Sequence, residues 1–201
     1  MNTERMNRLD QMIEEDRLIR HAWTDGQERA CLLAALSPEA GAAESAESCP
    51  SAVMPRWLAN LTPALDDNGS ADAWSSMVRR YAAVARRWHV LSDADWQCLD
   101  YAARAIAVRY ARQYATEREH PTIDTVLALL NRAAAGEEVS EQEWDAAWDA
   151  ASAAASAAVG DAVGDAVGDA AWAAAMAAAW DSMTADILSA IEAACAAKES
   201  P

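Results

Sequence analysis

Residues 144–180, WDAAWDAASAAASAAVGDAVGDAVGDAAWAAAMAAAW, decide the fold that we predict for this chain. Ala has the highest intrinsic helix propensity of the amino acids, and more than half of this stretch is Ala. Ser140 and Glu143 precede it with the Ser-x-x-Glu spacing of a capping box, which marks the start of a helix. The sequence therefore predicts helix from Ser140 to about Ala197.

A four-residue repeat runs through this stretch, with Trp, Ser or Gly in one phase and Asp in the next. A period of four drifts by about 40° per repeat on an α-helix, so the stripe winds slowly around it. Small residues at this spacing allow another backbone to approach closely, and Gly160, Gly164 and Gly168 are predicted close-packing positions. Each interior Gly costs about 1 kcal/mol relative to Ala, so the helix is predicted to be weakest over 159–169 and either continues or breaks there.

Apolar residues in the rest of the chain recur at helical spacing, and no segment shows the alternation typical of strands. We predict an all-α, multi-helix bundle of about six or seven helices, including a long Ala-rich C-terminal helical segment. A helical domain over 1–136 and an acidic segment over 137–201 packed on it are predicted to form one folding unit. Small, proline-bounded residues predict a mobile loop over 38–55, and Asp-Asp-Asn-Gly predicts a turn within 62–70. The other helices are predicted over 3–23, 27–36, 71–90, about 93–119 and 121–136.

The chain is strongly acidic, with 32 Asp and Glu against 16 Lys and Arg and a net charge of −16. This balance argues against direct binding to nucleic acid or to an anionic membrane, because both require a basic face. Residues 1–136 carry 19 acidic residues and 15 Arg, whereas residues 137–201 carry 13 acidic residues and a single base, Lys198. Such an asymmetry indicates either a partner or a role in solubility.

The sequence contains no residue pattern typical of catalysis or of a bound cofactor. Its four Cys residues are too far apart for a Cys-x-x-Cys pair, and the one Glu-x-x-His, at Glu117–His120, lacks the second copy that a di-iron bundle needs. We therefore predict a protein that is not an enzyme and that has no cofactor and no metal. The N-terminus has no apolar signal segment, and the apolar run 170–180 is too short to span a bilayer, so we expect a cytoplasmic location in a bacterial host cell.

Acidic and Trp side chains near the start of the Ala-rich segment form the candidate partner-binding site. Carboxylates four residues apart rise by about 6 Å along a helix, whereas each DNA strand carries a phosphate every 3.4 Å or so, so this row alone imitates DNA imperfectly. A solvated face without a partner is the competing interpretation. The candidate residues are Glu137, Glu138, Glu141, Trp144, Asp145, Trp148, Asp149, Asp161, Asp165, Asp169 and Trp172.

Residues 101–136, YAARAIAVRYARQYATEREHPTIDTVLALLNRAAAG, and the Ala-rich tail beginning EWDAAWDAAS together resemble a helical, Ala-rich family of immunity proteins from bacterial polymorphic toxin systems. The resemblance covers about the C-terminal half of the chain. It implies an all-helical, non-catalytic inhibitor that binds a cognate toxin. As a type, a small and strongly acidic chain without catalytic motifs also resembles phage-encoded inhibitors of host defence, including anti-CRISPR proteins.

These observations predict a protein inhibitor that binds a nucleic-acid-handling effector, either a defence complex or a toxin, and covers its basic surface. Charge complementarity would speed association, and buried Trp would supply affinity. One alternative is an immunity protein whose cognate toxin need not bind nucleic acid. A further alternative is a helical structural protein that self-assembles, and a homodimer is compatible with any of these.

Overall fold

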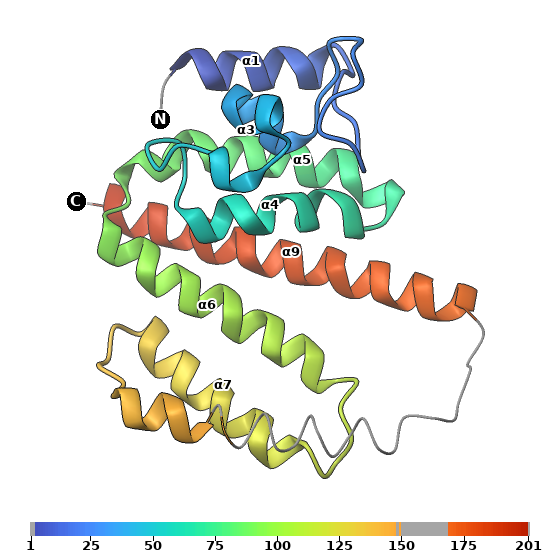
Figure 1. Ribbon diagram of the computed structural model, residues 1–201. Coiled ribbons are helices and arrows are strands. Elements are labelled where there is room, and N and C mark those ends of the chain that lie inside the picture. Colours follow the sequence, from blue (N-terminus) through green and yellow to red (C-terminus); the bar gives the residue numbers. More distant parts are fainter. Residues whose placement is uncertain (1–2, 148, 150–168, 201) are drawn as a thin grey trace. The chain divides into compact units, whose positions relative to one another are not determined.

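The computed structural model describes residues 3–147, 149 and 169–200, and gives only the backbone of 169–174 (Figure 1). Within these ranges the fold is all-α, as predicted, and β-structure is limited to isolated bridges of Ala30 with Leu18 and Thr24. Contacts divide the chain into two compact units, which we describe separately. Unit 1 comprises Met1–Ser92 and Met176–Pro201, and unit 2 comprises Asp93–Ala175, so the division does not follow the boundary after Gly136 that the charge had suggested.

Unit 1 is built from short and medium helices around an apolar core. Leu9, Leu33, Leu58 and Ile187 come from four different helices and are almost completely buried, together with the ring of Tyr81. The Tyr81 hydroxyl lies 2.8 Å from the Thr62 hydroxyl, which satisfies both polar groups inside the core. The helices are α1 (Thr3–Glu14), α2 (Leu32–Leu36), α3 (Pro38–Ala43), α4 (Arg56–Asn68), α5 (Ala71–Arg87) and, from Met176, α9 (Asp169–Glu199), with 3-10 turns η1 (Ala46–Ser48) and η2 (Trp88–Val90).

The first two helices are shorter than the sequence predicted. The helix expected over 3–23 ends at Glu14, and Asp16 then takes a left-handed conformation with φ of 51°. After this turn the chain is irregular, and Leu18 is buried in the core although it is not part of a helix. The helix expected over 27–36 spans only Leu32–Leu36, because Gly26 and Glu28 both have positive φ, which a helix cannot accommodate.

The segment 38–55 is not the continuous loop that we predicted, because Pro38–Ala43 and Ala46–Ser48 are helical. Pro38 begins α3, with the Ser37 hydroxyl accepting a hydrogen bond from the Ala40 N–H as an N-terminal cap. Gly41 is buried so close to Ala34 that an added Cβ would lie 2.8 Å from the Ala34 Cβ. The small residues of this segment therefore serve close helix packing, and Met54 is likewise buried.

The turn predicted over 62–70 is confined to its last residues. α4 continues through Pro63 to Asn68, and Gly69 ends it. The helices that follow agree closely with the sequence: α5 spans Ala71–Arg87 of the predicted 71–90, and η2 covers the remainder.

Charged side chains join α5 to the elements on either side of it. Arg80 donates to both carboxylate oxygens of Glu192, at 3.0 and 2.6 Å, and to the Ser189 hydroxyl at 2.7 Å. Arg87 pairs with Glu199 on the same partner helix, α9. On the other side, Arg86 pairs with Asp10 of α1. These ion pairs fix the C-terminal helix within unit 1.

Unit 2 is a hairpin of two helices followed by a shorter one. α6 (Asp93–Arg112) and α7 (His120–Ala134) pack side by side, and a further helix covers 141–147. α6 ends earlier than the predicted 119, while α7 corresponds closely to the predicted 121–136. Arg112 and Asp124 form a bidentate pair across the hairpin at 2.6 and 2.9 Å. Buried apolar residues of this unit include Leu99, Ala103, Ile106, Leu129, Leu130 and Ala133.

Candidate functional site

The segment 137–149 of unit 2 holds most of the predicted partner-binding residues that the structure describes. Gly136 ends the preceding helix with φ of 81°, a conformation that favours glycine. The Ser140 N–H and hydroxyl then donate to the Glu143 carboxylate at 2.9 and 2.8 Å, and the Glu143 N–H donates back to the Ser140 hydroxyl at 3.3 Å. The predicted capping box is confirmed, and it begins the helix over 141–147.

Two acidic residues of this segment are used within unit 2. Arg132, on α7, donates to Glu143 at 2.7 Å and to Glu137 at 3.3 Å. The hydrogen bond from Arg132, aided by the two from Ser140, lowers the pKa of Glu143 from 4.5 to about 2. Glu137 and Glu143 therefore hold the start of the helix in place.

Trp144 also has a role inside the unit. Its indole stacks on the ring of Tyr101, with ring centroids 5.8 Å apart and planes 12° from parallel. The side chain is half-buried, so one face of the indole packs within unit 2. An offset aromatic stack of this kind contributes about 0.5–1.5 kcal/mol beyond the area that it buries.

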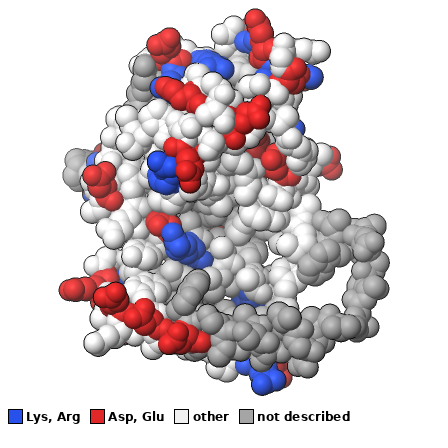
Figure 2. All heavy atoms as spheres, viewed as in Figure 1, with Lys and Arg blue, Asp and Glu red and all other residues white. Residues whose placement is uncertain are grey.

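Four carboxylates of the segment have no such role, and we call Glu138, Glu141, Asp145 and Asp149 the acidic ridge. All four are exposed, and none has a hydrogen bond or ion pair within the described part of the chain. Glu141, Asp145 and Asp149 follow one another at four-residue spacing, which on a helix places them on one face. Figure 2 shows a row of acidic side chains over this segment.

The remaining predicted site residues lie outside what the structure describes. Trp148, Asp161 and Asp165 are among the residues that are not described, as are the predicted packing positions Gly160, Gly164 and Gly168. Asp169 and Trp172 belong to α9 by their backbone, but their side chains are not described. The acidic ridge is therefore the part of the predicted site that the structure brings together.

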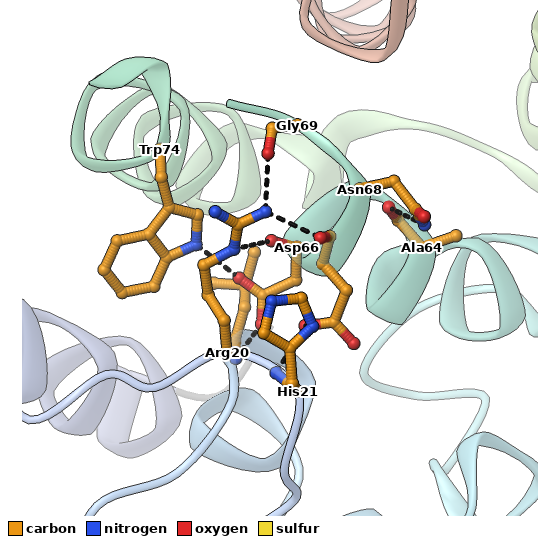
Figure 3. A network of polar contacts seen from close by, with 9 residues as sticks. Arg20, His21, Ala64, Asp66, Asn68, Gly69 and Trp74 are labelled. Atoms are coloured by element: carbon orange, nitrogen blue, oxygen red, sulfur yellow. Dashed lines mark hydrogen bonds and ion pairs between the residues drawn. The ribbon is translucent and has the colours of Figure 1, made fainter. Parts of the chain in front are cut away.

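A second polar cluster, in unit 1, was not predicted from the sequence (Figure 3). Asp66 is only 1% exposed, and its carboxylate accepts hydrogen bonds from the Leu32 N–H at 3.0 Å and the Trp74 indole N–H at 2.7 Å. Burial raises the pKa of Asp66, and the two hydrogen bonds oppose that rise. The carboxylate joins the start of α2 to α5, so it has a structural role.

Arg20 completes this cluster from the irregular segment after α1. Its guanidinium donates to the main-chain carbonyls of Asp66, Asp67 and Gly69, at 2.8, 2.6 and 2.6 Å. These carbonyls belong to the C-terminal end of α4, where the helix leaves acceptors unpaired and favours a cation. The hydrogen bonds drawn in Figure 3 all join one residue of the protein to another. The described contacts of this cluster, including the one from the Leu32 N–H, therefore stabilise the fold.

The described residues show no arrangement that would hold a metal ion through three or more His, Cys, Asp or Glu side chains. All four Cys residues are free thiols, and burial raises the pKa of Cys31, Cys49 and Cys195, which makes them poor nucleophiles. None of the described helices has the length and apolar character needed to cross a bilayer.

Comparison with known proteins gives no family to which the chain can be assigned: no family model, no curated protein and no solved structure matches it.

Proposed function

We propose that this chain is a non-catalytic inhibitor that binds a nucleic-acid-handling effector protein and covers its basic surface. The observation that carries the proposal is the acidic ridge of unit 2, where four exposed carboxylates have no cationic partner among the described residues. The basic side chain closest in sequence, Arg132, already pairs with Glu137 and Glu143. The ridge therefore presents negative charge that the described fold does not use.

The ridge also carries an energetic cost for the chain itself. Carboxylates four residues apart on a helix repel one another by about 0.2–0.5 kcal/mol per pair. A partner with Arg and Lys at matching positions would remove this repulsion. Such charges act mainly on the association rate and on the choice of partner, because exposed ion pairs add little affinity individually.

The immunity-protein alternative uses the same surface and differs in the effector, which would be a toxin of any activity. The self-assembly alternative rests on the four-residue repeat at 152–168, which lies outside the described residues. The experiment is therefore designed to separate a basic, nucleic-acid-binding partner from any other partner and from a second copy of the chain.

The test compares the parent chain with a ridge variant carrying Glu138→Gln, Glu141→Gln, Asp145→Asn and Asp149→Asn. A matched control carries four exposed acidic residues of unit 1 changed in the same way: Glu14→Gln, Glu44→Gln, Glu47→Gln and Asp72→Asn. Each immobilised protein is exposed to bacterial lysate at low salt and at about 1 M salt, where the Debye length falls to about 3 Å. Captured proteins are identified by mass spectrometry and then tested, as purified proteins, for competition with duplex DNA.

The proposal requires a captured protein that binds duplex DNA and that this chain displaces from the DNA. Its rate of association with the ridge variant should be lower than with the parent by about 10-fold or more, and its rate with the control should be unchanged. Equal capture and equal inhibition by the parent and the ridge variant would contradict it. A ridge-dependent partner that does not bind nucleic acid would instead favour the immunity alternative. Oligomers of the chain as the only recovered species would favour self-assembly.

A further inference from the structure

Unit 1 contains a pocket of about 150 Å³ between the end of α4, the first half of α5 and the part of α9 that belongs to this unit. It lies in a different unit from the acidic ridge and does not depend on the proposed function. Its apolar lining includes Leu65, Trp74, Met77 and Leu188. A cavity of about this size accommodates a molecule as large as benzene.

The walls of the pocket are held in position by hydrogen bonds made elsewhere. The Trp74 indole is fixed by its hydrogen bond to the buried Asp66 carboxylate, which Figure 3 shows from close by. The Arg80 guanidinium is held by Glu192, by the Ser189 hydroxyl and by the main-chain carbonyl of Ala185. Because these side chains are already ordered, binding a ligand costs little further side-chain conformational entropy.

Two polar side chains of α9 in the lining have hydrogen-bonding capacity that the described residues do not use. Thr184 is only 3% exposed, yet its hydroxyl makes no hydrogen bond with any described residue. Its neighbours on α9 behave differently, because the Ser182 and Ser189 hydroxyls donate to the carbonyls one turn earlier, of Ala178 and Ala185. The Thr184 hydroxyl oxygen keeps some access to solvent at the pocket, so it is free to bond a ligand there.

The second group is the Asp181 carboxylate, one helical turn before Thr184. One of its oxygens accepts a hydrogen bond from the Ser70 N–H at 2.9 Å, and the other has no partner in the described part of the chain. No Lys, Arg or His pairs with Asp181 among the described residues, whereas Arg80 in the same pocket is neutralised by Glu192. The charge left uncompensated in the lining is therefore negative.

From this juxtaposition we infer that the pocket binds a small primary amine with an apolar body about the size of a benzene ring. The ammonium group donates to the free oxygen of Asp181 and lies within reach of the Thr184 hydroxyl, which accepts from it. The apolar body packs against Met77 and the indole of Trp74, and an ammonium group beside an indole gains further from the cation–π attraction. A neutral ligand would leave the negative charge of Asp181 uncompensated, so the pocket discriminates by charge.

The test titrates benzylamine into the full-length protein and follows the Trp74 indole N–H signal by NMR. Toluene and benzyl alcohol, which have the same ring and no charge, are the matched ligands. For a molecule this small we expect a dissociation constant between about 10 µM and a few millimolar. Benzylamine is expected to bind at least 10-fold more tightly than either neutral ligand.

Three variants assign the effect to named groups. Asp181→Asn removes the charge but keeps an oxygen to accept from the Ser70 N–H, and it is expected to weaken benzylamine binding by at least 10-fold. Thr184→Val is expected to weaken it several-fold, and Ala185→Leu, which fills the pocket, to abolish it. Ser182→Ala, on the exposed side of the same helix, is the control and is expected to leave binding unchanged. Circular dichroism of each variant confirms that it is folded.

Two results would overturn the inference. One is the absence of saturable binding of benzylamine up to about 20 mM, a concentration well above the weakest affinity expected. The other is binding of toluene and benzyl alcohol as tightly as benzylamine, with no effect of Asp181→Asn. That second result would leave only an apolar cavity.

Discussion

The two units use their ion pairs over very different distances along the chain. In unit 1, Arg80 pairs with Glu192 and Arg87 with Glu199, in each case 112 residues apart, and Arg86 pairs with Asp10, 76 residues away. In unit 2, Arg112 pairs with Asp124 only 12 residues away, and Arg132 pairs with Glu143 only 11 residues away. Unit 1 is thus cross-linked between distant elements, whereas unit 2 is held by neighbours.

The acidic ridge lies in the unit whose described ion pairs are local. In unit 1, Glu192, Glu199 and Asp10 are each oriented toward an Arg on another helix. In unit 2, Arg104 pairs with Asp100 one turn earlier, and Arg132 pairs with Glu143 at the start of the next helix. The acidic ridge comes after the last Arg of the chain, and among the described residues none of its carboxylates has a basic partner.

The largest effect that would sharpen the comparison is expected at Asp66. Asp66→Ala leaves the Leu32 N–H and the Trp74 indole N–H without an acceptor, and each such loss costs about 1–3 kcal/mol. We expect unfolding of unit 1 to become easier by about 2–4 kcal/mol, measured by urea denaturation. Asp66→Asn keeps one acceptor oxygen and is expected to lose less. A change below about 0.5 kcal/mol for Asp66→Ala would show that the cluster does not stabilise unit 1.

A smaller effect is expected from the long-range pairs themselves. Arg80→Met removes hydrogen bonds to Glu192, Ser189 and the Ala185 carbonyl, and should cost about 1–2 kcal/mol, since the pair is partly exposed. Arg104→Met in unit 2 breaks a pair within one helix and should cost only about 0.3–0.5 kcal/mol. Equal losses in thermal and urea denaturation would remove the distinction between the two units.

The pH dependence of unit 2 should follow Glu143. Because its pKa is about 2 in the folded chain against an ordinary 4.5, the carboxylate stabilises the folded state above about pH 4.5. That contribution is lost as the pH falls from there toward 2. The stability difference between the parent and Glu143→Gln should therefore shrink between about pH 5 and about pH 3, as measured by urea midpoints. A difference that stays constant over this range would mean that the Arg132 pair contributes nothing.

The smallest effect has the opposite sign. Asp145→Asn relieves the repulsion of Asp145 from Glu141 and Asp149 and should stabilise unit 2 by about 0.2–0.5 kcal/mol at low salt. High salt should reduce this gain, because exposed charges are screened. Hydrogen exchange of the helix over 141–147 measures it locally. Destabilisation by Asp145→Asn would show that the Asp145 carboxylate stabilises the fold, which would contradict its assignment to partner binding.

Local signals in the sequence were sufficient where a helix is determined by its own residues. The apolar stripe of α5, the end of α7 shortly before Gly136 and the capping box of Ser140 with Glu143 each depend on residues close together in the chain, and the sequence predicted them. The segment from Asp16 to Ala30 was not, because its positive-φ residues and the donation from Arg20 to the end of α4 depend on elements far along the chain.

The predicted and unpredicted parts of the two sites differ in the same way. The helical spacing of the acidic ridge and the absence of any Arg after position 132 can both be seen in the sequence. The burial of Asp66 could not be seen in Asp-Asp-Asn-Gly, a sequence typical of a turn, because its partners Leu32 and Trp74 come from other helices. The pocket was missed for a similar reason, although Asp181 at the end of a long apolar run is a signal that invites inspection.

Unit 1 is a discontinuous domain, since its first 92 residues meet their last partner only in Met176–Pro201. During synthesis the ribosome would release α1 to α5 and then all of unit 2 before the helix that carries Glu192 and Glu199 emerges. The surface of the N-terminal part that α9 covers therefore stays exposed while unit 2 is synthesised. Unit 2 can fold during this time, because its described contacts are local. Completion of unit 1 therefore has to follow the synthesis of unit 2.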